Sequence, residues 1–181
     1  MIKVLLQISI EKIFGFSYLK QLYKKNYSDP DFNNNFWKKT LEILRIEHIL
    51  KNAERIPKQG PCIIVSNHPF GILDGLIICS EVAKLRKDYR ILINEELTAI
   101  DHIRDYLFPL RLDMSKDALK LNIKSKNDAI EFINKGGLVI IFPSGEVATS
   151  ERLFNKAIEK EWKPIIGSIV RKVNCKILPI Y

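Results

Sequence analysis

The segment CIIVSNHPFGILDG, residues 62–75, decides how the chain is expected to fold. Its first four residues are apolar and three of them are β-branched, which predicts a strand buried on both faces. Polar and turn-forming residues follow at once, and we expect a helix between Gly71 and about Arg86. A buried strand that leads through a short turn into a helix is typical of α/β domains with a parallel sheet.

The same alternation of short apolar runs and helical patterns extends from this segment to the end of the chain. The clearest strand is LVIIF at 138–142, and Gly136-Gly137 stops the helix before it. We therefore expect an α/β fold with a largely parallel or mixed central sheet flanked by helices, preceded by an N-terminal amphipathic helical pair. The further strands are expected at 90–93, 110–112 and 176–180, and the further helices at 36–52, 100–107, 125–135 and within 151–172.

Length and composition agree with one globular domain of this kind. The chain has 181 residues, 46% of them hydrophobic, with only 8 Gly and 8 Pro, which excludes disordered and collagen-like classes. Its three cysteines show no CxxC spacing, so neither a disulfide framework nor a structural zinc site is expected, and a reducing compartment is indicated. No apolar run reaches the 18 or more residues of a transmembrane helix.

The net charge of +8, concentrated toward the N-terminus, suits an anionic membrane surface, an acidic carrier protein or nucleic acid. Nucleic acid ranks last, because the chain has no helix-turn-helix, zinc or aromatic RNA-binding pattern. Residues 1–27 are predicted to form two short helices separated at Gly15, and residues 28–181 the α/β domain. The helical pair is apolar on most sides and must be buried either against the domain core or in a membrane interface.

His68 and Asp74 are the candidate reactive groups, because both follow the strand at 62–65, where α/β sheets collect their reactive side chains. A bend at Gly71 would let the Asp74 carboxylate bind one ring nitrogen of His68 and leave the other free as a base. The alternative is structural, with Asp74 as a helix cap and His68 as a turn residue.

Four blocks together carry a family resemblance: EKIFGFSYLKQLY at 11–23, NHPFGILDG at 67–75, FPSGEV at 142–147 and ILPI at 177–180. In this order they resemble the lysophospholipid acyltransferase family of the PlsC type, and most closely its hemolysin-like branch, which includes acyltransferases that make ornithine and glycine lipids. The resemblance covers nearly the whole chain. It moves the interpretation of residues 1–27 toward the membrane interface.

The resemblance implies an O-acyltransferase of lipid biosynthesis. His68 would act as the general base on a lysolipid hydroxyl, oriented by Asp74, and the hydroxyl would attack the thioester of acyl-CoA or acyl-ACP. It implies no metal, no cofactor beyond that thioester co-substrate and no covalent acyl-enzyme. The residues implied in substrate binding are Asn67, Gly71, Phe142, Pro143, Ser144, Gly145 and Glu146.

The chain departs from the wider family at three places. Five residues separate His68 from Asp74 where the family has four, and we expect Gly71 to absorb the extra residue. Ser144 replaces a glutamate, with Glu146 two places later, and Met114 stands where an arginine is usual, with Arg111 nearby. This incomplete phosphate-binding set favours a lyso-aminolipid acceptor. A lysophosphatidic acid acyltransferase and a non-catalytic lipid-binding protein are the alternatives.

The remaining expectations concern partners and isolated residues. The partners implied are an anionic membrane surface, a lysolipid acceptor and an acyl carrier protein or coenzyme A thioester, for a peripheral protein on the cytoplasmic side of a bacterial inner membrane. The family usually continues beyond the last block, and the sequence leaves open whether this chain is a truncated form. We interpret His48 as a core or boundary residue, His102 as exposed, Cys62 as an inert buried thiol, and the lysines at 116, 120, 124 and 126 as a solvated helix edge.

Overall fold

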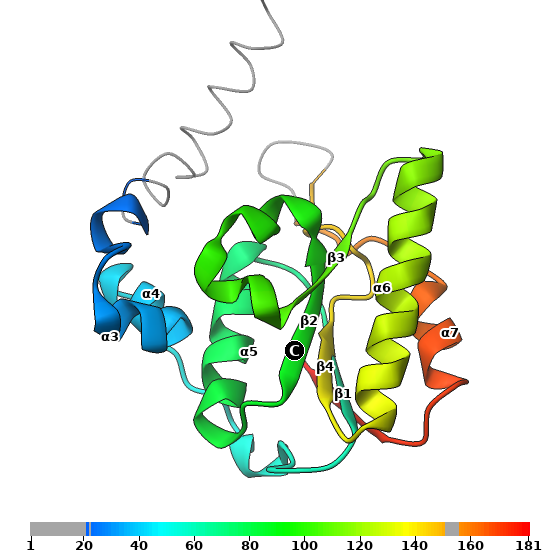
Figure 1. Cartoon of the computed structure of the whole chain (residues 1–181), viewed down its shortest axis with the longest axis horizontal. Helices are drawn as coiled ribbons and strands as arrows, with labels where there is room; N and C mark the ends of the chain where they lie inside the picture. The colour runs from blue at the N-terminus through cyan, green and yellow to red at the C-terminus, as the bar shows by residue number, and fades with distance from the viewer. Residues whose placement is uncertain (1–20, 22, 151–155) are drawn as a thin grey trace, which may run out of the picture. The chain divides into compact units, whose positions relative to one another are not determined.

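In the computed structural model of the chain, residues 21, 23–150 and 156–181 are described, and the chain divides into two compact units (Figure 1). The first unit ends at Glu47 and the second runs from His48 to Tyr181. Most of the helical pair expected in residues 1–27 lies outside the described residues. No helix in the described part of the chain combines the length and apolar character that crossing a membrane requires.

The described part of the first unit is held together by aromatic side chains. Helix α3 (Pro30–Asn34) begins after Asp29, whose carboxylate accepts a hydrogen bond from the Asp31 amide at 2.9 Å. Helix α4 (Phe36–Ile43) follows directly. The ring of Phe36 lies 5.2 Å from that of Phe32 and 5.3 Å from that of Trp37, both in edge-on contact. Such pairs combine apolar burial with favourable ring electrostatics.

Helix α4 is shorter than predicted, since the sequence pattern indicated a helix to residue 52. It ends because Arg45 adopts a left-handed conformation with φ 55°. The Ile46 amide donates to the Leu41 carbonyl and the Arg45 amide donates to the Glu42 carbonyl, which together form a Schellman motif. A non-glycine residue rarely takes this position, so this helix end could not be predicted from the sequence.

The second unit contains a five-stranded sheet in which every pair of neighbouring strands is parallel. The predicted α/β fold is therefore confirmed. The strand order is β3-β2-β4-β1-β5, so β1 lies inside the sheet between β4 and β5. The strands are β1 (Cys62–Ser66), β2 (Tyr89–Asn94), β3 (Leu107–Leu110), β4 (Leu138–Ile141) and β5 (Lys176–Ile180).

Helices cover both faces of the sheet, with α5 (Ile72–Leu85) on one side and α6 (Lys116–Asn134) and α7 (Ile165–Val170) on the other (Figure 1). Because side chains alternate along a strand, each strand of the sheet contributes to both layers. The α6 and α7 side contains a core cluster of Ile63, Val65, Leu92, Ala129, Ile133, Val139, Ile141 and Ile169, all buried.

Two element boundaries differ from the prediction for local reasons. Strand β3 ends at Leu110, whereas a strand was expected at 110–112; it contains Pro109, which a sheet accepts because β3 is an edge strand. Helix α6 begins at Lys116 and not near residue 125, because the Ser115 hydroxyl caps it by accepting from the Ala118 amide at 3.1 Å. The short helix expected at 100–107 is the 3₁₀ helix η3 (Asp101–Tyr106), which follows η2 (Glu95–Ala99).

A buried arginine donates hydrogen bonds to the loops at the amino ends of the strands and so holds these loops together. The side chain of Arg86 is only 2% exposed. Its guanidinium donates to the carbonyls of Pro57, Gly60 and Gly136 at 3.2, 2.9 and 2.8 Å. It also binds both carboxylate oxygens of Asp88, and this hydrogen bonding holds the pKa of Asp88 below its ordinary value. One side chain thus satisfies three loop carbonyls.

Replacing Arg86 with Met should lower the free energy of unfolding by about 3 kcal/mol, because three carbonyls lose their donor inside the protein. Urea denaturation at pH 7 measures this change. Arg104→Met is the matched control, since Arg104 forms an exposed ion pair with Asp101, and it should cost less than about 0.5 kcal/mol.

The same pair predicts a pH dependence. Because the pKa of Asp88 is lower in the folded protein than in the unfolded chain, the Asp88 carboxylate stabilises the fold. This stabilisation is complete above the pKa that Asp88 has in the unfolded chain, and it is lost as the pH falls through the pKa that Asp88 has in the folded protein. The stability difference between wild type and Arg86→Met should therefore narrow in acid. An Arg86→Met protein as stable as wild type at pH 7 would contradict the fastening role.

Candidate functional site

The site is set by the register between β1 and β4. Cys62 pairs with Leu138 and Val65 pairs with Ile141, so both strands run in step toward the same edge of the sheet. The segment that begins at Asn67 and the segment that begins at Phe142 therefore leave the sheet side by side. This is the edge where parallel sheets place their reactive groups.

His68 and Asp74 are in contact, as the sequence predicted. His68 Nδ1 lies 3.1 Å from Asp74 Oδ2, and the two side chains are 17% and 11% exposed. The same Asp74 oxygen accepts the Phe70 amide at 2.9 Å. Since an ionised carboxylate can only accept hydrogen bonds, Nδ1 is the protonated nitrogen in this arrangement. Nε2 then keeps its lone pair and can accept a proton.

Gly71 makes this contact possible across five intervening residues. It has φ 64°, a conformation that strongly favours glycine, and it directly precedes α5. A Cβ at this position would also lie 3.2 Å from a methyl group of Val147. Gly71 thus bends the chain before α5, and Asp74 falls in the first turn of that helix.

The segment after β4 packs against the His68 imidazole. The ring of Phe142 stacks on that of His68 with centroids 4.2 Å apart and an interplanar angle of 22°. Phe142 and Pro143 are buried. Ser144 is fully buried, and its hydroxyl donates to the Glu146 carbonyl at 2.9 Å, so this side chain shapes the turn. Gly145 has φ 67°, and its amide donates to the Phe142 carbonyl at 2.9 Å.

Lys163 joins this turn, although sequence reasoning did not single it out. Its amide donates to the Pro143 carbonyl at 2.9 Å, and its ammonium binds the exposed carboxylate of Glu146 at 3.1 Å. It lies 17 residues from Glu146 and belongs to no motif, so no local signal announced it. Asn67 is half-buried, and its carbonyl accepts the Ser66 hydroxyl at 3.0 Å.

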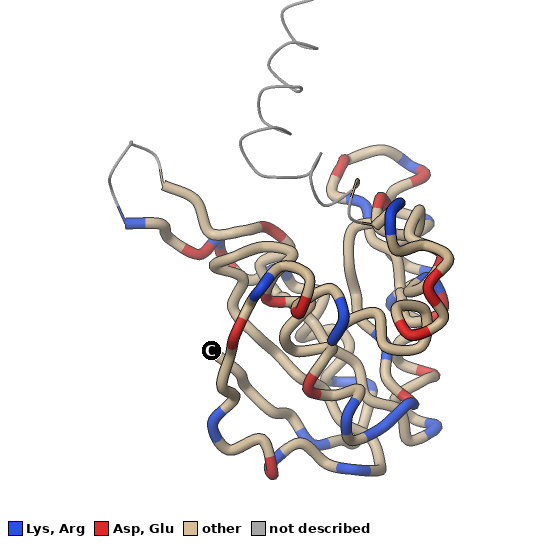
Figure 2. The backbone as a smooth tube through the Cα atoms, turned by 90° about the vertical axis from the view of Figure 1, so that its left-hand side faces the viewer, with Lys and Arg blue, Asp and Glu red and all other residues tan. Residues whose placement is uncertain are grey.

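A two-stranded arm holds the main chain of His68. We use "the arm" for residues 147–150 and 156–160, which Figure 2 shows extending from the body of the protein. The Thr149 and Ile158 backbones pair with each other as an antiparallel bridge. The Ala148 amide donates to the His68 carbonyl, and the His68 amide donates to Glu159 Oε2, both at 3.0 Å. Glu159 was also missed by sequence reasoning.

Arg111, the candidate substitute for the family's arginine, is already engaged. Its Nε lies 3.0 Å from a Glu95 carboxylate oxygen and 2.9 Å from one of Asp113. Its main chain is fixed by Asn122, which accepts from the Arg111 amide and donates to the Arg111 carbonyl, both at 2.8 Å. Two carboxylates thus compensate the one guanidinium.

The other singled-out residues lie apart from this contact. Cys62 is buried, and burial raises the pKa of its thiol to about 11, so the inert thiol expected there is confirmed. His48 is half-buried and its Nε2 lies 2.6 Å from a Glu81 carboxylate oxygen, as expected for a boundary residue. His102 is half-buried, so the prediction that it is exposed was wrong. No three His, Cys, Asp or Glu side chains of the described residues are grouped as a metal site.

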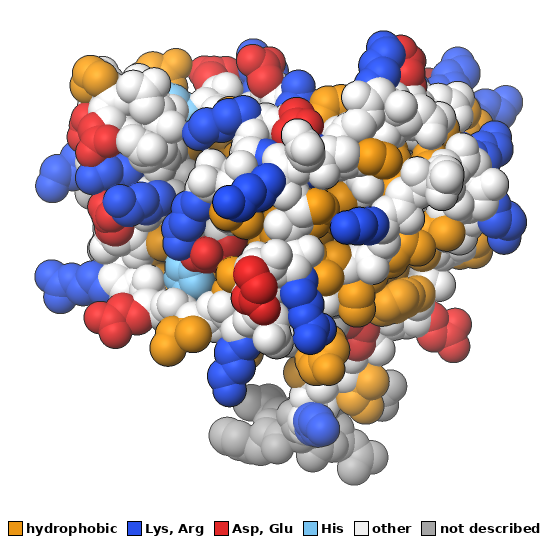
Figure 3. Space-filling view, turned by 90° about the horizontal axis from the view of Figure 1, so that it is seen from below, with side chains coloured by type: hydrophobic (Ala, Val, Ile, Leu, Met, Phe, Trp, Pro, Cys, Tyr) orange, Lys and Arg blue, Asp and Glu red, His pale blue; other side chains and the backbone are white. Residues whose placement is uncertain are grey.

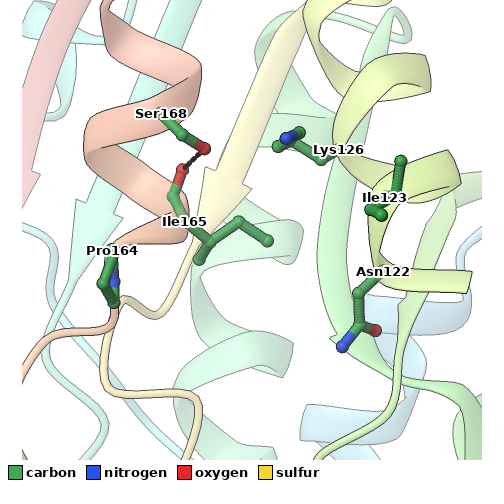
Figure 4. A pocket seen from close by; sticks show the side chains of 6 residues that line it. All are labelled: Asn122, Ile123, Lys126, Pro164, Ile165 and Ser168. Atoms are coloured by element: carbon green, nitrogen blue, oxygen red, sulfur yellow. Dashed lines mark hydrogen bonds between the residues drawn. The ribbon is translucent and has the colours of Figure 1, made fainter. Parts of the chain in front are cut away.

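One hollow of about 220 Å³ lies between α6 and the segment that begins α7, and neither His68 nor Asp74 lines it. Figure 4 shows side chains of α6 facing those around α7 across it. The hollow is lined by Asn122, Ile123, Lys126, Pro164, Ile165 and Ser168.

On the face of the molecule that Figure 3 shows, charged side chains of both signs are interspersed among the described residues.

Comparison with known proteins agrees with the fold. The chain is 26% identical over 176 residues to a lyso-glycine lipid O-acyltransferase of Phocaeicola vulgatus, covering 93% of this chain and 61% of that protein. Its fold matches the crystal structure of the 1-acyl-sn-glycerophosphate acyltransferase PlsC of Thermotoga maritima with a TM-score of 0.56 and 18% identity, covering 96% of this chain and 73% of that one. Residues 48–181 match the model of the family described as Acyltransferase. A match over most of its length shows that the chain belongs to the acyltransferase family.

Proposed function

We propose that this chain is an O-acyltransferase that moves a fatty acyl group from an acyl thioester to the hydroxyl of a lysolipid. The observation that carries the proposal is the 3.1 Å contact between His68 and Asp74 at the carboxyl edge of a parallel sheet. Family membership supports the acyl-transfer class. The chain spans 61% of the length of the lyso-glycine lipid O-acyltransferase it resembles, and the activity of that relative supports the lysolipid acceptor.

In the proposed reaction, His68 Nε2 removes the proton from the acceptor hydroxyl as its oxygen attacks the thioester carbonyl carbon. The carbon–oxygen bond forms, the carbon–sulfur bond breaks, and the departing thiolate of coenzyme A or of the carrier protein takes up the proton. Asp74 keeps Nδ1 protonated and stabilises the imidazolium that forms. Transfer is direct in this proposal, because Cys62 is buried at the amino end of β1, whereas His68 follows the carboxyl end of that strand.

The proposed acceptor is a lyso-aminolipid, because Arg111 and Lys163, two described cations at this edge of the sheet, are already paired. Arg111 binds Glu95 and Asp113, and Lys163 binds Glu146. A phosphomonoester headgroup would require cations not already balanced by carboxylates. A headgroup with less negative charge makes no such demand.

We also propose a peripheral location on an anionic membrane surface on the cytoplasmic side. The support is the sequence pattern of residues 1–27, apolar on most sides with Lys12, Lys20, Lys24 and Lys25. Each lysine near an anionic surface contributes about 1 kcal/mol to binding. This location would bring the site to its lipid acceptor.

His68→Ala should lower the rate of acyl transfer at least about 10³-fold and Asp74→Asn about 10²-fold, because general base catalysis contributes that much. The rate is measured as acylated lipid formed from a lyso-glycine lipid and acyl-CoA or acyl-ACP, by mass spectrometry. His102→Ala is the matched control and should keep the wild-type rate.

Liposome flotation separates the enzyme from a non-catalytic lipid-binding protein. His68→Ala should bind liposomes as wild type does while it loses turnover. A folded His68→Ala protein that transfers acyl groups at the wild-type rate would contradict the assigned base.

The acceptor assignment predicts that kcat/KM for a lyso-glycine lipid exceeds that for lysophosphatidic acid by at least about 10-fold. The double variant Glu95→Gln, Asp113→Asn leaves Arg111 uncompensated and should shift the ratio toward lysophosphatidic acid. Glu96→Gln is the control, since the described structure shows Glu96 exposed at the same turn. A clear wild-type preference for lysophosphatidic acid would overturn the lyso-aminolipid assignment.

A further inference from the structure

The arm binds both backbone groups of His68, its N–H and its C=O. The Ala148 amide, on the outgoing part of the arm, donates to the His68 carbonyl at 3.0 Å. Glu159, on the returning part, accepts the His68 amide at 3.0 Å. The bridge between Thr149 and Ile158 ties the two parts together one residue beyond each contact. The main chain of the candidate base therefore depends on residues 80 or more positions away in sequence.

We propose that Glu159 is a positioning residue for the acyl-transfer reaction: its carboxylate, by accepting the His68 amide, sets where the His68 imidazole stands. This inference rests on the proposed function of His68. The side-chain contact with Asp74 fixes one nitrogen of the ring, and Glu159 fixes the main chain from which the ring projects. The two contacts together determine the direction in which Nε2 points.

Among the described residues, the His68 amide is the hydrogen-bond donor that the Glu159 carboxylate binds. Its second oxygen, Oε1, is buried and has no hydrogen-bond partner among the described residues. Leaving a buried carboxylate oxygen unpaired costs folding free energy. A glutamine oxygen could accept the same amide, so the positioning role requires the acceptor atom on Glu159 and not its charge.

The arm also links the base to the second motif. The arm follows the 142–146 turn directly. After the arm, the Lys163 amide donates a hydrogen bond to the Pro143 carbonyl of this turn. Val147, at the start of the arm, contacts the position where a Cβ of Gly71 would stand. A displacement of the arm would therefore reach His68 through its peptide and through the turn that leads to Asp74.

The test compares Glu159→Ala with Glu159→Gln in the full chain, with Glu161→Gln as the matched control, because Glu161 is exposed two residues away. Glu159→Ala should lower kcat about 10- to 100-fold and leave the KM for the thioester within about 3-fold, since small misplacements of a reacting group cost this much. Glu159→Gln should restore kcat to within about 3-fold of wild type, and neither variant should melt at a lower temperature than Glu161→Gln by more than about 4 °C.

A second readout does not require turnover. Hydrogen exchange of the His68 amide, followed by NMR, should be faster in Glu159→Ala than in wild type and unchanged in Glu161→Gln. If the wild-type protein transfers no acyl group but the His68 amide still exchanges faster in Glu159→Ala, the proposed function is wrong, while the contact between Glu159 and the His68 amide is supported. A wild-type kcat in Glu159→Ala, a change confined to KM, or a glutamine variant as impaired as the alanine variant would each overturn the positioning role.

Discussion

Parallel pairing of β1 with β4 is the constraint on which the site depends. Because Val65 and Ile141 occupy the same level of the sheet, the chain leaves both strands at one edge, and His68 meets Phe142 across that edge. The apolar layers on either side hold the register, since a shift by one residue would turn Ile63, Val65, Val139 and Ile141 away from α6 and α7. The reactive geometry is thus a consequence of core packing, and the loops only complete it.

Local signals predicted what is local in this site. The spacing of His68 and Asp74, with a glycine between them, allowed a bend and a contact, the family resemblance favoured that contact over a helix cap, and both bend and contact are present. The boundaries that were wrong depended on single contacts, such as the Ser115 cap of α6 and the left-handed Arg45 after α4. Glu159 and Lys163 could not be found, because their partners lie 91 and 17 residues away and belong to no periodic pattern.

Charge is handled differently at the two ends of the sheet. At the amino ends, Arg86 is almost fully buried and compensated by Asp88 and three carbonyls, an arrangement that serves stability. At the carboxyl ends, Arg111 and Lys163 are partly exposed and paired with carboxylates, while Glu159 keeps one buried oxygen without a described partner.

The central claim is that Asp74 holds the His68 ring with Nδ1 protonated and Nε2 open to receive a proton. The most direct measurement is ¹⁵N NMR of ring-labelled histidine in the folded protein above the pH at which the ring is charged, with the His68 signals assigned by comparison with His68→Asn. The account predicts that Nδ1 resonates as a protonated nitrogen and Nε2 as an unprotonated one, and that Asp74→Asn abolishes this preference. A His68 ring with its proton on Nε2, or one indifferent to Asp74, would contradict the account.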